Sequence, residues 1–101
     1  MRVLLERSGG FAGVRRVARL DPGRLPAADE ERLRAAADAA GFFALPPEVR
    51  AAKAAPDRFT YRLEMEDGAR RRDVRFDEEA ASEELRELVE LVEELAAGEG
   101  A

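Results

Sequence analysis

The feature that most constrains the fold is a tight turn between two stretches of alternating residues. Over Phe59–Glu66, apolar and polar side chains alternate strictly, which is the period of a β-strand with one buried face. Asp67-Gly68 is a residue pair that favours a hairpin turn. Arg70–Phe76 then returns as a second strand, so this stretch predicts an antiparallel hairpin. The returning strand is predicted to face the core with Val74 and Phe76.

A second hairpin is predicted at the N-terminus, with less regular patterning. Met1–Arg7 is the first strand, and its Val3 and Leu5 are expected to point inward. Val14–Leu20 is the second strand, but its apolar residues do not share one face, which favours a β-bulge. Between them, Ser8–Gly13 holds three glycines in six residues, and glycine permits the positive φ angles of a tight reversal.

Each hairpin is followed by a predicted helix. Pro26–Ala40 has proline and acidic residues near its start and apolar residues at helical spacing, and Gly41 is placed to cap its end. The second helix is expected to begin between Asp77 and Ser82. It carries an apolar stripe at helical spacing, formed by Leu85, Leu88, Val89, Val92 and Leu95 and widened by Leu91.

The remaining segments are less regular. Phe42–Pro47 is an apolar connector whose phenylalanine pair is expected to close the edge of the core. Glu48–Pro56 fits either a loop or one helical turn. Residues 98–101 are expected to fray, which leaves residues 1–97 as a single domain.

These elements predict an α+β fold with the order ββαββα. Short turns make antiparallel pairing within each hairpin the expected arrangement, and two amphipathic helices need one apolar sheet face to cover. We therefore expect one four-stranded antiparallel sheet with two helices packed on one face. The pattern leaves open the order of the two hairpins in the sheet.

The composition argues against an enzyme. The chain has no Cys and no His, which removes disulfides, thiolate metal sites and Ser-His or Cys-His nucleophiles. Paired carboxylates could still perform acid–base chemistry, but no motif supports this, and no EF-hand spacing is present. The sequence predicts no catalytic residue, no metal site and no cofactor.

The charge distribution argues against nucleic-acid binding. Residues 77–101 carry ten acidic residues and one Arg, whereas residues 1–76 carry twelve acidic and sixteen basic residues. Nucleic-acid binding needs a continuous basic face. The densest basic run, Arg70 to Arg75, alternates between the two faces of its strand, and some members are expected to pair with Glu64 and Glu66. The acidic face of the second helix is expected to be solvated, and its like-charge pairs at Glu83/Glu87 and Glu90/Glu94 hint at a cationic counterpart on the sheet or on a partner.

No targeting or membrane segment is predicted. A signal peptide needs about 7–15 apolar residues after its basic start, but charge returns here at Glu6 and Arg7. No stretch approaches the roughly 20 apolar residues of a membrane span. We expect a cytoplasmic protein that makes no membrane contact, and export by an unusual route stays open.

The glycine-rich reversal is the first candidate for a binding site. It displays one large apolar side chain, Phe11, which either folds back onto the core or serves as an exposed anchor for a partner. Ser8 lacks a His or a nearby Lys to take its proton, so a hydroxyl that stabilises the turn is the better interpretation. The spacing of a phosphate-binding loop is absent.

Five segments in a fixed order give the chain a recognisable pattern: Arg7–Gly13, Gly41–Pro46, Asp57–Tyr61, the Asp67-Gly68 turn and Val74–Asp77. In these segments the chain resembles the emfourin family. Emfourin-like proteins are small inhibitors of protealysin and other thermolysin-like metallopeptidases. The resemblance implies stoichiometric inhibition of a peptidase made in the same bacterium and kept in check inside the cell.

The partner that the resemblance implies is a thermolysin-like metallopeptidase. From the residues themselves we expect such an inhibitor to be a monomer when free and to block the cleft of its target sterically. The alternative is a non-inhibitory interaction module, or a homodimer that uses the open sheet face. The residues expected to contact the partner are Ser8, Gly9, Gly10, Phe11, Ala12 and Gly13.

Overall fold

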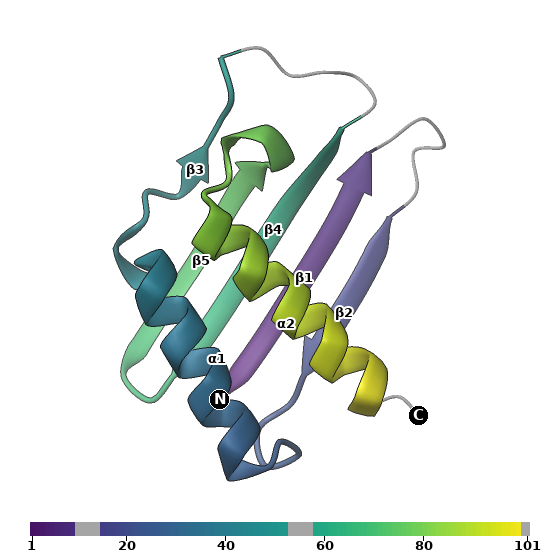
Figure 1. Ribbon diagram of the computed structural model, residues 1–101, viewed down its shortest axis with the longest axis vertical. Coiled ribbons are helices and arrows are strands. Elements are labelled where there is room, and N and C mark those ends of the chain that lie inside the picture. The colour runs from purple at the N-terminus through teal and green to yellow at the C-terminus, as the bar shows by residue number, and fades with distance from the viewer. Residues whose placement is uncertain (10–14, 53–57, 100–101) are drawn as a thin grey trace.

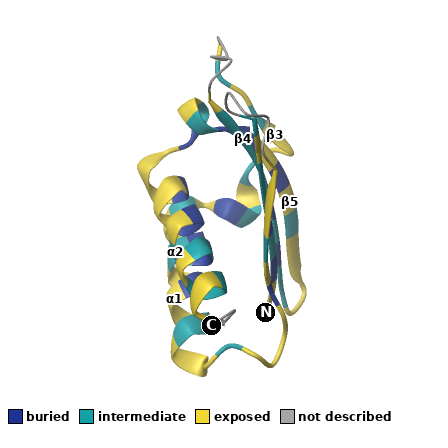
Figure 2. Cartoon of the chain, turned by 90° about the vertical axis from the view of Figure 1, so that its right-hand side faces the viewer, coloured by how far each residue is buried: buried dark blue, intermediate teal, exposed yellow. Residues whose placement is uncertain are grey.

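The computed structural model describes residues 1–9, 15–52 and 58–99, which form two layers (Figures 1 and 2). One layer is a five-stranded mixed sheet with the order β2-β1-β4-β5-β3, and two helices cover one of its faces. This confirms the α+β class and the placement of both helices. The strands are β1 Arg2–Gly9, β2 Arg16–Leu20, β3 Glu48–Val49, β4 Phe59–Asp67 and β5 Arg70–Asp77.

The prediction of four antiparallel strands needs one correction. β3 is a fifth strand that pairs in parallel with β5, where Glu48 and Val49 lie opposite Arg75 and Phe76. The Arg75 amide also donates to the Pro47 carbonyl at 2.8 Å. The interpretation of Glu48–Val49 as loop or helical turn was therefore wrong. A strand of two residues is too short to show a period, and its conformation is set by the neighbouring strand.

The two predicted hairpins are confirmed, and they join through antiparallel pairing of β1 with β4. Val3 and Leu5 are buried as expected. The predicted bulge is wrong for Arg16–Leu20, which pairs with β1 without interruption. Val17 broke the apolar pattern because it lies on the open face of the sheet, where 47 % of it is exposed. Val14 lies outside the described residues.

Both helices match their predicted positions closely. α1 spans Ala27–Ala40 and ends at Gly41, whose φ of 61° is the left-handed conformation predicted for a cap. α2 spans Glu83–Glu99 after a short 3₁₀ helix, η2, at Glu78–Ala80. The Leu85 amide donates to the Ser82 hydroxyl at 3.1 Å, which makes Ser82 the N-cap at the end of the predicted window. α2 thus runs through Gly98 into the segment expected to fray. No described helix is long and apolar enough to cross a membrane.

The core lies between the helices and the inner face of the sheet. Phe42 lies in the 3₁₀ helix η1 (Phe42–Ala44), and its side chain is fully buried. Its ring meets the Phe43 ring edge to face, with 5.6 Å between the two centroids. This pair closes the edge of the core, as predicted. Each large apolar side chain buried here contributes roughly 1.5–3 kcal/mol. The largest are Phe42, Phe76, Leu20, Leu33, Leu63, Met65, Leu88, Val3, Val74 and Val92.

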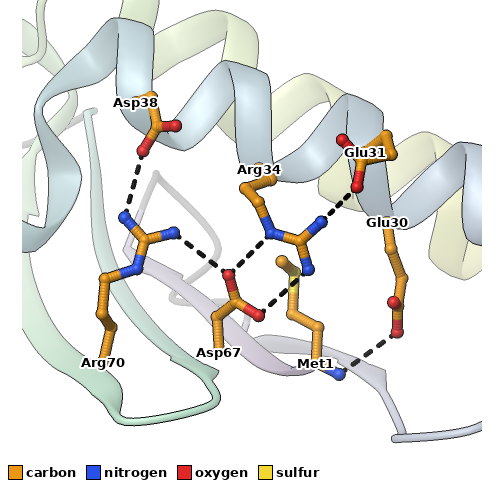
Figure 3. A network of polar contacts seen from close by, with 7 residues as sticks. All are labelled: Met1, Glu30, Glu31, Arg34, Asp38, Asp67 and Arg70. Carbon is orange, nitrogen blue, oxygen red and sulfur yellow. Dashed lines mark hydrogen bonds and ion pairs between the residues drawn. The ribbon is translucent and has the colours of Figure 1, made fainter.

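A polar network ties α1 to the turn between β4 and β5 (Figure 3). Arg34 of α1 donates to Asp67 through Nε at 2.9 Å and through Nη2 at 3.1 Å. Arg70 donates to the same carboxylate at 3.1 Å and to Asp38 at 3.2 Å. The hydrogen bonds from Arg34 and Arg70 lower the pKa of Asp67 to about 2, and the one from Arg34 has the larger effect. The network lies at the end of the sheet opposite Gly9.

The open face of the sheet carries paired charges. Arg62 donates to both oxygens of Asp73, with the shortest contact at 2.8 Å, and Arg71 donates to Glu64 at 3.0 Å. Arg70 and Arg72 instead point to the inner side, toward Asp38 and the Leu45 carbonyl. The basic run therefore divides between two faces, as predicted, and forms no single basic patch.

Candidate functional site

One end of the sheet brings together segments that are far apart in the sequence (Figure 1). β1 ends there at Gly9, β4 begins at Phe59 and β5 ends at Asp77. Because β3 is parallel to β5, the residues that follow Val49 also reach this end. We call it the Gly9 end. It is defined by Ser8–Gly9, Arg50–Ala51, Arg58–Tyr61 and Asp77–Ala81.

Two of the six predicted contact residues lie within the described part of the chain. Ser8 is exposed, and its hydroxyl donates to the Thr60 carbonyl at 3.5 Å, in keeping with a stabilising role. Gly9 is the last residue of β1. Gly10, Phe11, Ala12 and Gly13 lie outside the described residues, so the anchor role of Phe11 stays a prediction.

Gly9 is required by its conformation and by its surroundings. Its φ of 105° is one that residues with a side chain rarely adopt. A Cβ atom at this position would lie 2.8 Å from the Arg58 carbonyl oxygen, which is closer than van der Waals contact allows. The end of β1 therefore packs directly against the backbone at the start of β4.

A cleft of about 640 Å³ lies between the inner face of the sheet and residues 86–93 of α2. The Tyr61 ring stacks on Phe76 at 5.3 Å between centroids and lines this cleft together with Val89 and Ala81. Charged side chains complete the lining: Arg7, Arg58, Arg86, Glu78, Glu79, Glu90 and Glu93. The sequence pattern did not predict this cleft, although Tyr61, an aromatic residue near the end of a strand that faces an acidic helix, was a signal for it.

The charges around the cleft pair with one another. Nη1 of Arg7 lies 3.8 Å from Oε1 of Glu93 in α2. The guanidinium carbon of Arg7 lies 4.8 Å from the centre of the Phe59 ring. Arg58 lies 3.2 Å from Glu79. Burial raises the pKa of Tyr61, so its hydroxyl stays protonated and can both donate and accept. Solvent-accessible ion pairs of this kind contribute about 0–1 kcal/mol to folding stability. Charged groups of a partner could therefore replace either member of a pair at little cost in free energy.

The acidic face of α2 is largely solvated, as expected, because Glu83, Glu84, Glu87 and Glu90 are exposed, and two of its residues meet arginines. Glu93 faces Arg7 of the sheet, and Glu94 accepts from Arg32 of α1 at 3.1 Å. Across residues 1–9, 15–52 and 58–99, acidic residues form no group of three that could hold a metal ion.

The fold and this site define a small two-layer α+β domain with a concave, charged surface at one end of its sheet. The family model for Emfourin matches residues 5–93, so the chain belongs to the Emfourin family. The match spans nearly all of the elements described above and confirms the resemblance seen in the sequence. Comparison with curated proteins and with solved structures gave no match.

Proposed function

We propose that this protein is a stoichiometric inhibitor of a thermolysin-like zinc metallopeptidase and that its Gly9 end covers the active-site cleft of the target. The observation that carries the proposal is the Emfourin match over residues 5–93, because emfourin-like proteins are metallopeptidase inhibitors. A protein inhibitor acts by binding, so no catalytic group of its own is needed.

The geometry of the Gly9 end supports this use. A standard inhibitor interface buries about 800 Å² on each partner and involves roughly 20–30 residues. Four strand ends and η2 meet at the Gly9 end, so a surface of this size can form from one face of the molecule. The continuous pairing of β1 with β4, up to Gly9 opposite Phe59, gives that surface a rigid base. A rigid base lowers the entropy lost on docking.

The proposed mechanism is steric occlusion. Ser8–Gly13 would enter or cover the peptidase cleft, with Phe11 in an apolar specificity pocket. Binding energy in such interfaces concentrates in a few buried anchors, and aromatic residues are prominent among them. Direct ligation of the peptidase zinc would need a carboxylate or a carbonyl, because the chain has no His and no Cys.

Inhibitor titration tests this function. Equimolar protein is expected to abolish the activity of a purified thermolysin-like peptidase. Phe11→Ala is expected to raise the inhibition constant about 30-fold or more, which corresponds to the loss of one anchor residue. Val17→Ala is the matched control because Val17 is apolar and exposed but lies on the open face. Full activity at equimolar wild-type protein would refute inhibition of that enzyme, and unchanged inhibition by Phe11→Ala would move the anchor elsewhere.

The alternative, a homodimer through the open sheet face, receives less support from the charges on that face. Arg62 lies within 4 Å of three carboxylates, those of Glu6, Glu64 and Asp73. Dimerisation there would remove water from these groups, and desolvation offsets the gain from ion pairing. We expect light scattering to give the mass of one chain, 11.1 kDa. A mass near twice that value would favour the alternative.

A further inference from the structure

The two edges of the sheet differ in how they are covered. At the β5 edge, the Leu45 carbonyl accepts from Arg72 of β5 at 2.7 Å, and the chain then continues into β3, which pairs with β5. At the other edge, β2 pairs with β1 alone among the described elements. Every second residue of an edge strand directs its N–H and C=O groups away from the sheet. β2 therefore offers donors and acceptors to another extended chain.

A groove of about 590 Å³ lies beside β2, between this strand and the last turns of α2 (Figure 1). Leu20 is fully buried, so Ala18 and Arg16, which precede it at intervals of two residues, lie on the same inner face of β2. A strand added beside β2 places every second side chain over this groove. Its apolar lining comes from Leu5, Ala18, Ala96 and Ala97.

The open face of β2 carries an exposed apolar side chain. Val17 is the single large apolar residue that is exposed within residues 1–9, 15–52 and 58–99. Its neighbours on this face are charged and paired, with Arg15 at 3.0 Å from Glu6. β-Branched side chains pack well between adjacent strands. An exposed valine at the edge of the sheet therefore favours the addition of another strand.

The charges on β2 indicate the chemistry of the added strand. Arg16 and Arg19 are exposed, one on each face of β2. The neighbouring carboxylates of Glu93 and Glu6 pair instead with Arg7 and Arg15. Opposite charges on adjacent strands stabilise their pairing. A strand with acidic side chains thus finds an arginine on either face.

A second copy of this chain is the less favourable occupant. Antiparallel pairing of two β2 strands about Ala18 would bring Arg16 and Arg19 of both copies to one seam. Like charges on adjacent strands are destabilising, and charged side chains on an edge strand oppose its pairing with itself. The arginines therefore act against self-association and leave the edge open to a chain of opposite charge.

We propose that β2 and the groove beside it bind an acidic, extended segment of a partner protein, which adds to the sheet as a further strand. Backbone hydrogen bonds to β2 supply the affinity, and the side chains supply the specificity. Carboxylates of the segment pair with Arg16 and Arg19, and an apolar side chain lies in the groove against Ala18. The inference does not rest on the proposed function, because it is tested with no peptidase present.

Peptide binding to the full chain tests the inference. The probe is a short synthetic peptide of alternating glutamate and valine, and the comparison probe has lysine in place of glutamate. Fluorescence anisotropy measures the binding, and hydrogen exchange locates it. Arg16→Glu and Arg19→Glu reverse the charges on β2. Arg24→Glu is the matched control, because Arg24 is exposed in the turn after β2 and does not line the groove.

We expect the wild-type protein to bind the glutamate peptide and not the lysine peptide, with slower hydrogen exchange at amides of Arg16–Leu20 and weaker binding at high salt. Each charge reversal on β2 should weaken this binding about fivefold or more, because a repulsion replaces an attraction. Arg24→Glu should change it by less than about twofold. The double variant Arg16→Glu/Arg19→Glu should bind the lysine peptide instead.

Ala97→Trp tests the groove. Ala97 is exposed and lines the groove, so a large side chain there should fill it and weaken peptide binding about tenfold. Ala39→Trp is the control, because it makes the same change at an exposed position of α1. Unchanged binding by Ala97→Trp would overturn the part of the inference that concerns the groove.

Three other results would overturn the inference as a whole. The first is no binding of the glutamate peptide to the wild-type protein at millimolar concentration. The second is equal weakening by Arg24→Glu and by the β2 variants, because a general effect of charge would then suffice. The third is a mass near twice 11.1 kDa with slowed exchange at β2, since a second copy would then occupy the edge.

Discussion

At the scale of single residues, the structure of the Gly9 end depends on two positions, Gly9 and Asp77, that each require one residue type. Gly9 combines a positive φ with a backbone contact too close for any other residue. Asp77 is buried and ionised because three donors surround it. The sequence predicts that a glycine-rich reversal needs unusual backbone angles, but it does not reveal which glycine lies against Arg58, since that contact joins distant segments.

Gly9→Ala is expected to destabilise the fold, because strain at an unfavourable φ costs about 1–3 kcal/mol and the Cβ atom must also displace the Arg58 carbonyl. Urea unfolding measures the change. Gly98→Ala is the control, since Gly98 is helical and has open space around its Cβ position, and alanine there should be neutral or slightly stabilising. Equal stability of Gly9→Ala and wild type would contradict the geometry assigned to Gly9.

At the scale of elements, the predictable parts are those with a long, regular period. The β4–β5 hairpin and both helices follow from alternation, turn residues and caps. β3 could not be predicted because two residues carry no period, and the irregular pattern of β2 reflects an exposed Val17 and not a bulge. The cleft beside Tyr61 depends on how α2 crosses the sheet, which local sequence does not encode.

The contact of Arg34 in α1 with Asp67 at the β4–β5 turn should make the stability of the fold depend on pH in the acidic range. The pKa of Asp67 is lowered from 3.8 to about 2 in the folded protein, so its contribution is fully present above pH 4. It is lost as pH falls from about 4 through 2, because the carboxyl is then protonated and its bonds to Arg34 weaken.

Asp67→Asn is expected to melt at a lower temperature than wild type at neutral pH. The difference between the two proteins should shrink as pH falls from about 4 to 2, since the wild-type carboxylate is then neutral too. Thermal unfolding followed by circular dichroism measures both proteins across this range. A difference that stays constant with pH would show that the ionised form of Asp67 contributes nothing to folding.

At the scale of the whole molecule, the two ends of the sheet differ in the contacts that they make. The end at Asp67 is fastened to α1 by paired charges. The Gly9 end gathers strand ends, the cleft and the hydrogen bonds that Asp77 and Glu78 accept on one surface. The family and the α+β class were accessible from the sequence, and the role of Ser8–Gly13 stays a prediction. The position of Arg50–Ala51 at the Gly9 end could not be predicted, because it depends on the parallel strand β3.

Binding calorimetry with an occupied active site tests the central claim most directly. The protein is titrated into a thermolysin-like peptidase, once free and once saturated with a small zinc-binding inhibitor in its cleft. We predict tight binding with one chain per free enzyme and loss of that binding to the occupied enzyme, because both ligands need the same cleft. Equal affinity for the free and the occupied peptidase would contradict the claim that the Gly9 end covers the active site.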